Sequence, residues 1–201
     1  MAAISEILPN GQGGKYTCGG SLIDPHVILT GAHCVNNKDP KSLTVRLGEW
    51  DTNTINEPMP HSDHEVLQII VHPHFGVANL FNDVALLVLR NPAKRSAHIN
   101  TVCLPPQNTK SEGECFATGW GADSYGHNEF YRVNLKKLGL PIIPQRDCQE
   151  SLRTTKLGPR FKIDQSFMCA GGERSVDTCT GDGGGPLGKL LGIEKFFSIY
   201  I

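Results

Sequence analysis

The sequence has little net charge of either sign, because 19 Lys and Arg residues stand against 20 Asp and Glu residues, which leaves −1. Proteins that bind nucleic acid or anionic membrane surfaces electrostatically carry a basic excess or a concentrated basic patch. The sequence also has no apolar run of the length that a membrane-spanning helix requires. It therefore predicts neither a nucleic-acid partner nor a membrane partner.

Internal repeats, low-complexity tracts and a signal peptide are also missing. The first residues, Met1 to Glu6, have no basic start followed by a long apolar core. With 39% hydrophobic and 19% charged residues, the 201-residue chain is typical of a packed protein, either one sizeable domain or two small ones sharing an interface. Its 22 Gly and 13 Pro residues favour short strands and many turns over helices.

Cysteine pairs of the CxxC type are absent, although the chain has seven cysteines. Structural zinc sites usually contain such pairs, whereas widely spaced cysteines indicate disulfides formed in an oxidising compartment. Seven is an odd number, so at least one thiol has no partner within this chain. Cysteines of this kind without a signal peptide predict that the 201 residues belong to a longer, extracellular precursor.

Patterns of alternating and continuous apolar residues predict a chain of short strands. Residues 16–23 and 27–30 are separated by Asp24-Pro25, which predicts a hairpin, and residues 31–35 follow as a tight turn or one helical turn. Residues 42–47 and 65–71 are further strands, residues 82–89 are an apolar run preceded by an acid, and residues 131–143 form the edge of a strand pair. A short helix is expected over residues 144–153, with proline at its start.

Three segments resemble the chymotrypsin-like (trypsin-type) serine proteases. The catalytic-histidine segment of that family is similar to Cys-Gly-Gly-Ser-Leu-Ile from Cys18, followed by Leu-Thr-Gly-Ala-His-Cys. The catalytic-aspartate segment is similar to Asn-Asp-Val-Ala-Leu-Leu from Asn82. Cys-Thr-Gly-Asp-Gly-Gly-Gly-Pro from Cys179 resembles the nucleophile loop, Gly-Asp-Ser-Gly-Gly-Pro. The resemblance covers nearly all of residues 16–187. It implies an all-β fold of two six-stranded barrels, over residues 1–100 and 101–201.

The resemblance also implies roles for individual residues. His33 takes the position of the general base and Asp83 that of the carboxylate that orients it. Gly183 stands where the family has its nucleophilic serine, and glycine has no hydroxyl. The backbone amides of Gly181 and Gly183 correspond to the oxyanion donors.

We expect no peptidase activity, because removing a triad serine costs about a million-fold in turnover. Thr178, Thr180 and Ser175 lie outside the turn that presents the nucleophile, so we expect none of them to replace it.

Two acidic residues that precede position 183 also match the family. Asp177 lies six residues before Gly183, where trypsin-like enzymes have the acid at the floor of the specificity pocket that selects Arg or Lys. The alternative is that Asp177 is a solvated loop residue. Asp182 matches the aspartate that receives a new N-terminal amine when a protease zymogen is activated. No Ile-Val-Gly-Gly-like sequence is present in this chain to supply that amine.

The cysteines match the family only in part. The resemblance implies the disulfides Cys18–Cys34 and Cys148–Cys169, and it leaves Cys103, Cys115 and Cys179 unpaired. Cys103 matches a cysteine that bridges to a preceding pro-region, and the partners of Cys115 and Cys179 would fall near Lys189 and beyond the last residue. After Leu187 the chain departs from the family pattern, so we expect the second barrel to be incomplete. Residues 190–201 are apolar and β-prone, which predicts an exposed edge or an aggregation site.

The loop after residue 47 raises the question of a metal. Four histidines occur in or after this loop, namely His61, His64, His72 and His74. We interpret them as solvated loop residues, since the sequence marks no third convergent ligand. In some family members the corresponding loop binds calcium through carboxylates, for which Glu49, Glu57 and Glu65 are candidates. Our prediction is no metal and no other cofactor, with calcium in the 49–65 loop as the open alternative.

Within the family, the chain is most similar to the non-catalytic clip-domain serine protease homologues of arthropods. Residues 47–52, 135–141 and 167–173 carry this likeness, as does the change of serine to glycine. It implies an extracellular cofactor or regulator in an immune cascade, with prophenoloxidase or its activating protease as partners. No clip domain is present in the 201 residues. Two other hypotheses are a truncated product without a stable function and an active endopeptidase.

Overall fold

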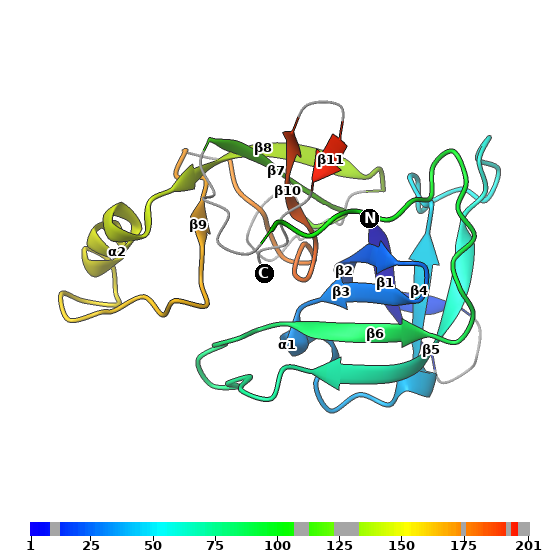
Figure 1. Cartoon of the computed structure of the whole chain (residues 1–201), viewed down its shortest axis with the longest axis horizontal. Coiled ribbons are helices and arrows are strands. Elements are labelled where there is room, and N and C mark those ends of the chain that lie inside the picture. Colours follow the sequence, from blue (N-terminus) through cyan, green and yellow to red (C-terminus); the bar gives the residue numbers. More distant parts are fainter. Residues whose placement is uncertain (9–12, 107–112, 123–132, 174–175, 192–193, 197–201) are drawn as a thin grey trace.

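The computed structural model describes residues 1–8, 13–106, 113–122, 133–173, 176–191 and 194–196. Within these ranges the protein consists mainly of short strands, with two α-helices and one 3-10 turn (Figure 1). None of the helices in the described ranges is long and apolar enough to cross a membrane. The expectation of an all-β fold is confirmed.

The first half is a closed barrel of six antiparallel strands in the order β1-β2-β3-β6-β5-β4. Its strands are β1 (Ala2–Ile7), β2 (Gly14–Asp24), β3 (Val27–Thr30), β4 (Leu43–Leu47), β5 (Ser62–Val71) and β6 (Ala85–Leu89). In β4 and β6 every second residue is buried, because successive side chains of a strand point to opposite faces. The predicted strand over residues 42–47 and the apolar run over residues 82–89 therefore contribute to the barrel core as β4 and β6.

Strand β1 was not expected from the sequence. Ala2 and Ala3 have low β-propensity, and the polar Ser5 and Glu6 leave no clear alternation. The strand forms because β2 and β4 pair with it from both sides, which closes the barrel. Ile4 lies opposite Cys18 and Val45 and is fully buried. In this strand, pairing with β2 and β4 and burial of Ile4 outweigh the weak local β-propensity.

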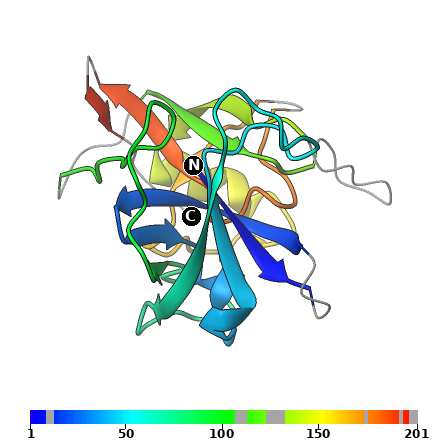
Figure 2. The ribbon, with the colours of Figure 1, turned by 90° about the vertical axis from the view of Figure 1, so that its right-hand side faces the viewer.

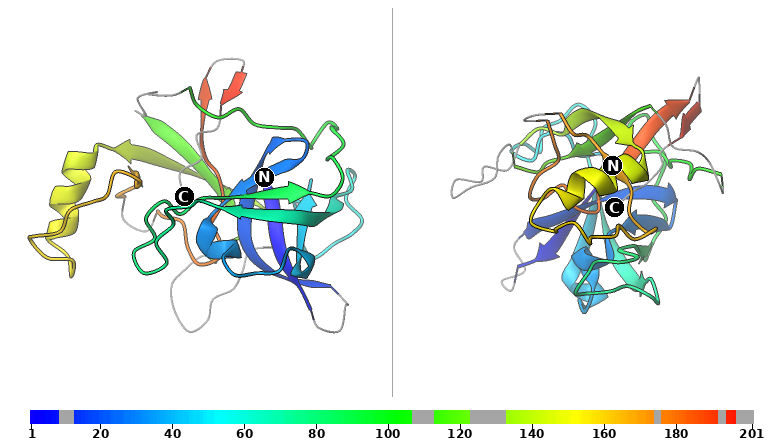
Figure 3. Two further views of the ribbon diagram at one scale, coloured as in Figure 1. Left: turned by 60° about the horizontal axis from the view of Figure 1, so that its bottom comes forward. Right: turned by 90° about the vertical axis from the view of Figure 1, so that its left-hand side faces the viewer.

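The described part of the second half is a five-stranded sheet in the order β11-β10-β7-β8-β9. Its strands are β7 (Glu114–Gly119), β8 (Lys136–Ile143), β9 (Cys169–Ala170), β10 (Leu187–Leu191) and β11 (Glu194–Phe196). Helix α2 (Gln145–Arg153) follows Pro144 as predicted and lies at the end of the molecule away from the first barrel (Figures 1 and 3). Of the apolar segment 190–201, β11 pairs with β10, and residues 197–201 lie outside the described residues.

The two halves are joined through Trp120, the largest of the fully buried side chains, at 2% exposure. Its indole Nε1 donates to the carbonyl of Trp50 at 3.3 Å, and its ring meets that of Tyr16 edge-on at a centroid distance of 5.9 Å. The amide of Leu135 donates to the same Trp50 carbonyl at 2.8 Å. In Figure 2 the first barrel, in blue and cyan, lies below β10 and β11. The functional site lies between these two halves.

Candidate functional site

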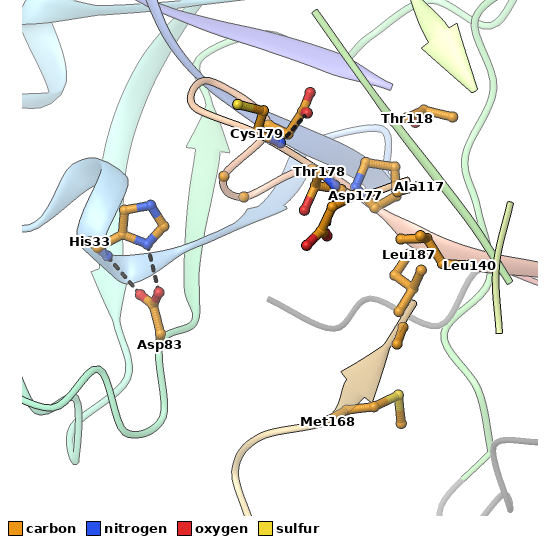
Figure 4. A pocket seen from close by; sticks show the side chains of 16 residues that line it. His33, Asp83, Ala117, Thr118, Leu140, Met168, Asp177, Thr178, Cys179 and Leu187 are labelled. Carbon is orange, nitrogen blue, oxygen red and sulfur yellow. Dashed lines mark hydrogen bonds and ion pairs between the residues drawn. The ribbon is translucent and has the colours of Figure 1, made fainter. Parts of the chain in front are cut away.

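His33 and Asp83 come together on the first barrel (Figure 4). His33 lies in helix α1 (Ala32–Val35), directly after β3, and Asp83 lies just before β6. The ring Nδ1 of His33 is 2.6 Å from one carboxylate oxygen of Asp83, and the backbone N–H of His33 donates to the other at 2.7 Å. This double contact fixes the ring, and Nδ1–H donation to the carboxylate leaves Nε2 as the basic nitrogen.

Local structure explains why these two residues are aimed at each other. Cys34 forms a disulfide with Cys18 on β2, with a Cα–Cα distance of 6.1 Å, which ties α1 to the barrel wall. Asn82 has a left-handed backbone, with φ of +53°, a conformation that asparagine tolerates better than most residues. Its side chain donates to the carbonyl of His74 at 3.1 Å, and its N–H donates to the hydroxyl of Ser166 at 3.2 Å. The tight turn at Asn82 sets the direction of Asp83.

Gly183 reaches the same place from the second half, in the turn before β10. Its carbonyl accepts a 2.8 Å hydrogen bond from the N–H of Gly19 on β2, which attaches this turn to the first barrel. A Cβ atom built on Gly183 would lie 2.8 Å from Nε2 of His33, closer than real Cβ atoms approach other atoms. The imidazole therefore lies against the space that a side chain at position 183 would need. At this position the chain offers no hydroxyl to His33.

The segment that carries the two expected oxyanion amides is held at several points. Gly181 has a φ of +97°, a conformation that favours glycine, and its carbonyl accepts a hydrogen bond from the Tyr16 hydroxyl at 2.7 Å. The carboxylate of Asp182 accepts from the N–H groups of Gly121 and Cys179 at 2.8 and 3.0 Å. Sequence reasoning missed Tyr16; its position two residues before Cys18 in the histidine segment was the available signal.

A cavity of about 380 Å³ opens beside His33, Asp83 and Gly183. Asp177 lines it and is exposed to solvent, and the N–H of Thr178 donates to the Asp177 carboxylate at 2.8 Å. Leu140, Met168 and Leu187 also line the cavity, on the side away from His33 and Asp83 (Figure 4). Asp177 is thus a solvated acid that also lines the cavity, and its role as the acid that selects Arg or Lys stays a prediction. Thr178 lines the cavity, Thr180 is exposed, and Ser175 lies outside the described residues.

The cysteines are arranged as the resemblance implies. The structure contains the disulfides Cys18–Cys34 and Cys148–Cys169, the second with a Cα–Cα distance of 6.3 Å. Cys103, Cys115 and Cys179 are free within the described residues, and of these Cys103 is exposed and Cys115 is buried. Burial raises the pKa of the Cys115 thiol, partly offset by the charge of Lys189.

The histidines and glutamates of the 48–74 region fall into separate groups. Glu65 is paired with Arg90 at 2.6 Å, and its side chain is 76% exposed. His64 contacts the Ser62 hydroxyl, and burial lowers its pKa, while the rings of His72 and His74 lie 5.8 Å apart. A third group contains Glu49, Glu57 and His61, whose potential ligand atoms all lie within 4.8 Å of one another.

The Asp83 carboxyl gives the site a defined pH dependence. Burial alone would raise the pKa of Asp83, but hydrogen bonds from the ring and backbone of His33 outweigh it and hold this pKa below its ordinary value of 3.8. A carboxyl with a depressed pKa in the folded state stabilises the fold above its unfolded pKa, and that contribution is lost as the pH falls through the folded pKa.

We therefore expect the free energy of unfolding to decrease as the pH falls below about 4, and Asp83→Asn to remove part of this decrease. Urea unfolding at a series of pH values from neutral to strongly acidic measures both curves. An Asp83→Asn variant whose stability follows the same pH dependence as that of the unsubstituted protein would contradict the assignment.

The fold is that of a chymotrypsin-like serine protease, with a closed six-stranded barrel, a second β-sheet, and a His–Asp pair on the barrel that faces Gly183 of the second half. The sequence profile of the Trypsin family matches residues 7–194, and the chain belongs to this family. It is 48% identical to Phenoloxidase-activating factor 2 of Galleria mellonella, over 97% of this chain and 67% of that protein. It is 42% identical to Inactive CLIP domain-containing serine protease A28 of Anopheles gambiae, over 87% of this chain and 45% of that protein. It is 40% identical to Inactive CLIP domain-containing serine protease A3 of Aedes aegypti, over 92% of this chain and 40% of that protein. The chain thus spans less than half the length of these two relatives.

Proposed function

We propose that this protein is a non-catalytic serine protease homologue that acts by binding in an extracellular immune protease cascade. The observation that carries the proposal is Gly183, which stands at the nucleophile position next to a His–Asp pair with otherwise complete geometry. Acyl transfer in this fold needs a hydroxyl against the base, and the backbone N–H of Gly183 does not supply one. The relatives described by name as inactive, and the one named as a phenoloxidase-activating factor, support this function.

The site that remains is suited to holding a polypeptide without cleaving it. The cavity beside Gly183 is about 380 Å³, and its lining includes Leu140, Met168 and Leu187 together with Asp177. An apolar wall beside the exposed Asp177 carboxylate fits a long basic side chain, because the methylene groups of that side chain pack against the wall while its charge reaches the carboxylate. We propose prophenoloxidase or its activating protease as the protein that supplies such a side chain.

The test is a binding measurement with immobilised chain and either prophenoloxidase or an active clip-domain protease. We expect saturable binding that is weakened by Asp177→Asn, because binding uses the carboxylate that lines the cavity. A protein that cleaves either partner, and loses that cleavage in His33→Ala, would instead be an enzyme. If neither partner binds the chain, the cofactor function proposed here is wrong.

A further inference from the structure

Positive charge is concentrated in one segment of the second half, at the end of helix α2 and in the turns that follow it. Residues 151–163 contain no Asp or Glu, and they contain the cations Arg153, Lys156, Arg160 and Lys162. The whole chain, in contrast, has a net charge of −1. None of these residues lines the cavity beside Gly183, so the segment is a second surface and not part of the protease-like site.

The acidic residues on either side of the segment have other partners. Glu150 is paired with Arg146 at 3.3 Å, one turn earlier in α2. The carboxylate of Asp164 accepts from the N–H and the hydroxyl of Ser166 at 2.9 and 2.6 Å. Three exposed cations therefore have no ion pair within the part of the chain that the structure describes, namely Lys156, Arg160 and Lys162.

Hydrogen bonds and a disulfide hold the segment in a defined shape. Nε of Arg153, the last residue of α2, donates to the carbonyl of Phe161 at 2.8 Å, which closes the turns between them. Inside this closed stretch the N–H of Phe161 donates to the carbonyl of Gly158 at 3.1 Å. The disulfide Cys148–Cys169 attaches α2 to β9. A ligand therefore meets cations on a backbone that is already ordered, which favours binding.

An exposed apolar side chain lies among the cations. Leu157 directly follows Lys156 in the chain and is 53% exposed. The phosphates of nucleic acids bind through many charge contacts and through a larger basic excess than this chain carries. Three cations around one leucine fit a shorter ligand that offers both carboxylates and an apolar group. A stretch of polypeptide rich in Asp and Glu has this chemistry.

We propose that the basic surface of Lys156, Leu157, Arg160 and Lys162 binds an acidic segment of a partner protein. Carboxylates of the partner pair with the two ammonium groups, and the guanidinium of Arg160 takes one carboxylate through two parallel N–H···O bonds. An apolar side chain beside the acids packs on Leu157. The basic surface lies at the end of the molecule away from the first barrel, the end that faces the viewer in the right-hand view of Figure 3. It is independent of the proposed function, which rests on the cavity beside Gly183.

Fluorescence anisotropy with the dye-labelled peptide Gly-Glu-Glu-Leu-Glu-Asp-Gly tests the proposal. We expect saturable binding to the unsubstituted protein, weakened by added NaCl because exposed charges are screened. The triple variant Lys156→Gln, Arg160→Gln and Lys162→Gln should bind the peptide between about threefold and about a hundredfold more weakly, the combined effect of three exposed ion pairs. Thermal unfolding of this variant checks that it remains folded.

The matched control removes the same charge elsewhere. Lys41→Gln, Lys94→Gln and Arg95→Gln together neutralise three exposed cations of the first half and should leave the affinity for the peptide unchanged. A peptide with Gln and Asn in place of Glu and Asp should not bind. Leu157→Ser should weaken binding of the acidic peptide but leave binding of heparin, a sulfated polysaccharide without apolar side chains, unaffected.

Three results would overturn the proposal. The first is absence of saturable binding of the acidic peptide. The second is an equal loss of affinity in the first-half control variant, which would show that the peptide responds to overall charge and not to the basic surface. The third is tighter binding of heparin than of the peptide, with no effect of Leu157→Ser on the peptide, which would make the basic surface a site for polyanions instead of a protein segment.

Discussion

The purified protein is expected to hydrolyse arginyl peptide substrates about a million-fold more slowly than a trypsin with its serine in place. That factor is the cost of losing the nucleophile when the base and orienting acid stay behind. Here the pair is intact, with His33 and Asp83 in contact at 2.6 Å, and the missing part is the hydroxyl at Gly183. A chromogenic arginyl peptide assay, with active-site titration to exclude a contaminating protease, measures the rate. Turnover within a few orders of magnitude of trypsin, abolished by His33→Ala, would refute the non-catalytic assignment.

The Gly183→Ser variant is expected to remain inactive by the same assay. A Cβ at this position would lie 2.8 Å from Nε2 of His33, so the ring has to move before a serine fits. The ring is held by the 2.6 Å contact of its Nδ1 with the Asp83 carboxylate, which the backbone N–H of His33 also binds at 2.7 Å. A serine would therefore displace the base that is meant to activate it. Strong turnover by Gly183→Ser, in a variant with unchanged thermal stability, would show that the site can readjust.

The fold was predictable where local pattern and burial agree. Strands β4 and β6 alternate strictly between buried and partly exposed residues. Strand β4 was expected from the alternation in residues 42–47, and β6 lies in the apolar run of residues 82–89. Strand β1 was missed, because Ala2 and Ala3 carry no β signal and their own partners lie 16 or more residues away. Helix α2 began after Pro144 as predicted, since a proline is favourable at a helix start.

The candidate site was predictable only where a motif fixes the spacing. Motif resemblance pointed to His33 and Asp83, which are 50 residues apart and in contact. No motif marked Tyr16, whose hydroxyl reaches the carbonyl of Gly181 across 165 residues. The approach of His61 to Glu49 also depends on how a loop containing two prolines turns back on itself, which composition does not specify. Contacts of this kind are set by tertiary packing and not by local sequence.

Trp120→Ala is expected to lower the free energy of unfolding by about 3–5 kcal/mol, the usual cost of truncating a large buried aromatic side chain. Trp120 is 2% exposed, and its indole joins the halves through the Trp50 carbonyl and the ring of Tyr16. Trp50→Ala is the matched control, because it truncates the other tryptophan, which is 57% exposed, and keeps the carbonyl that Trp120 contacts. That variant should change the stability by no more than about 0.5 kcal/mol.

Urea unfolding of both variants, followed by circular dichroism, measures the difference. The site draws His33 from the first barrel and Gly183 from the second half, so loss of the Trp120 contact should also weaken binding of a partner at the cavity. A Trp120→Ala protein as stable as Trp50→Ala would mean that the hydrogen bonds between the halves, such as Gly19 to Gly183, hold them together without the indole. A large loss of stability with unchanged partner binding would instead place the binding surface on one half alone.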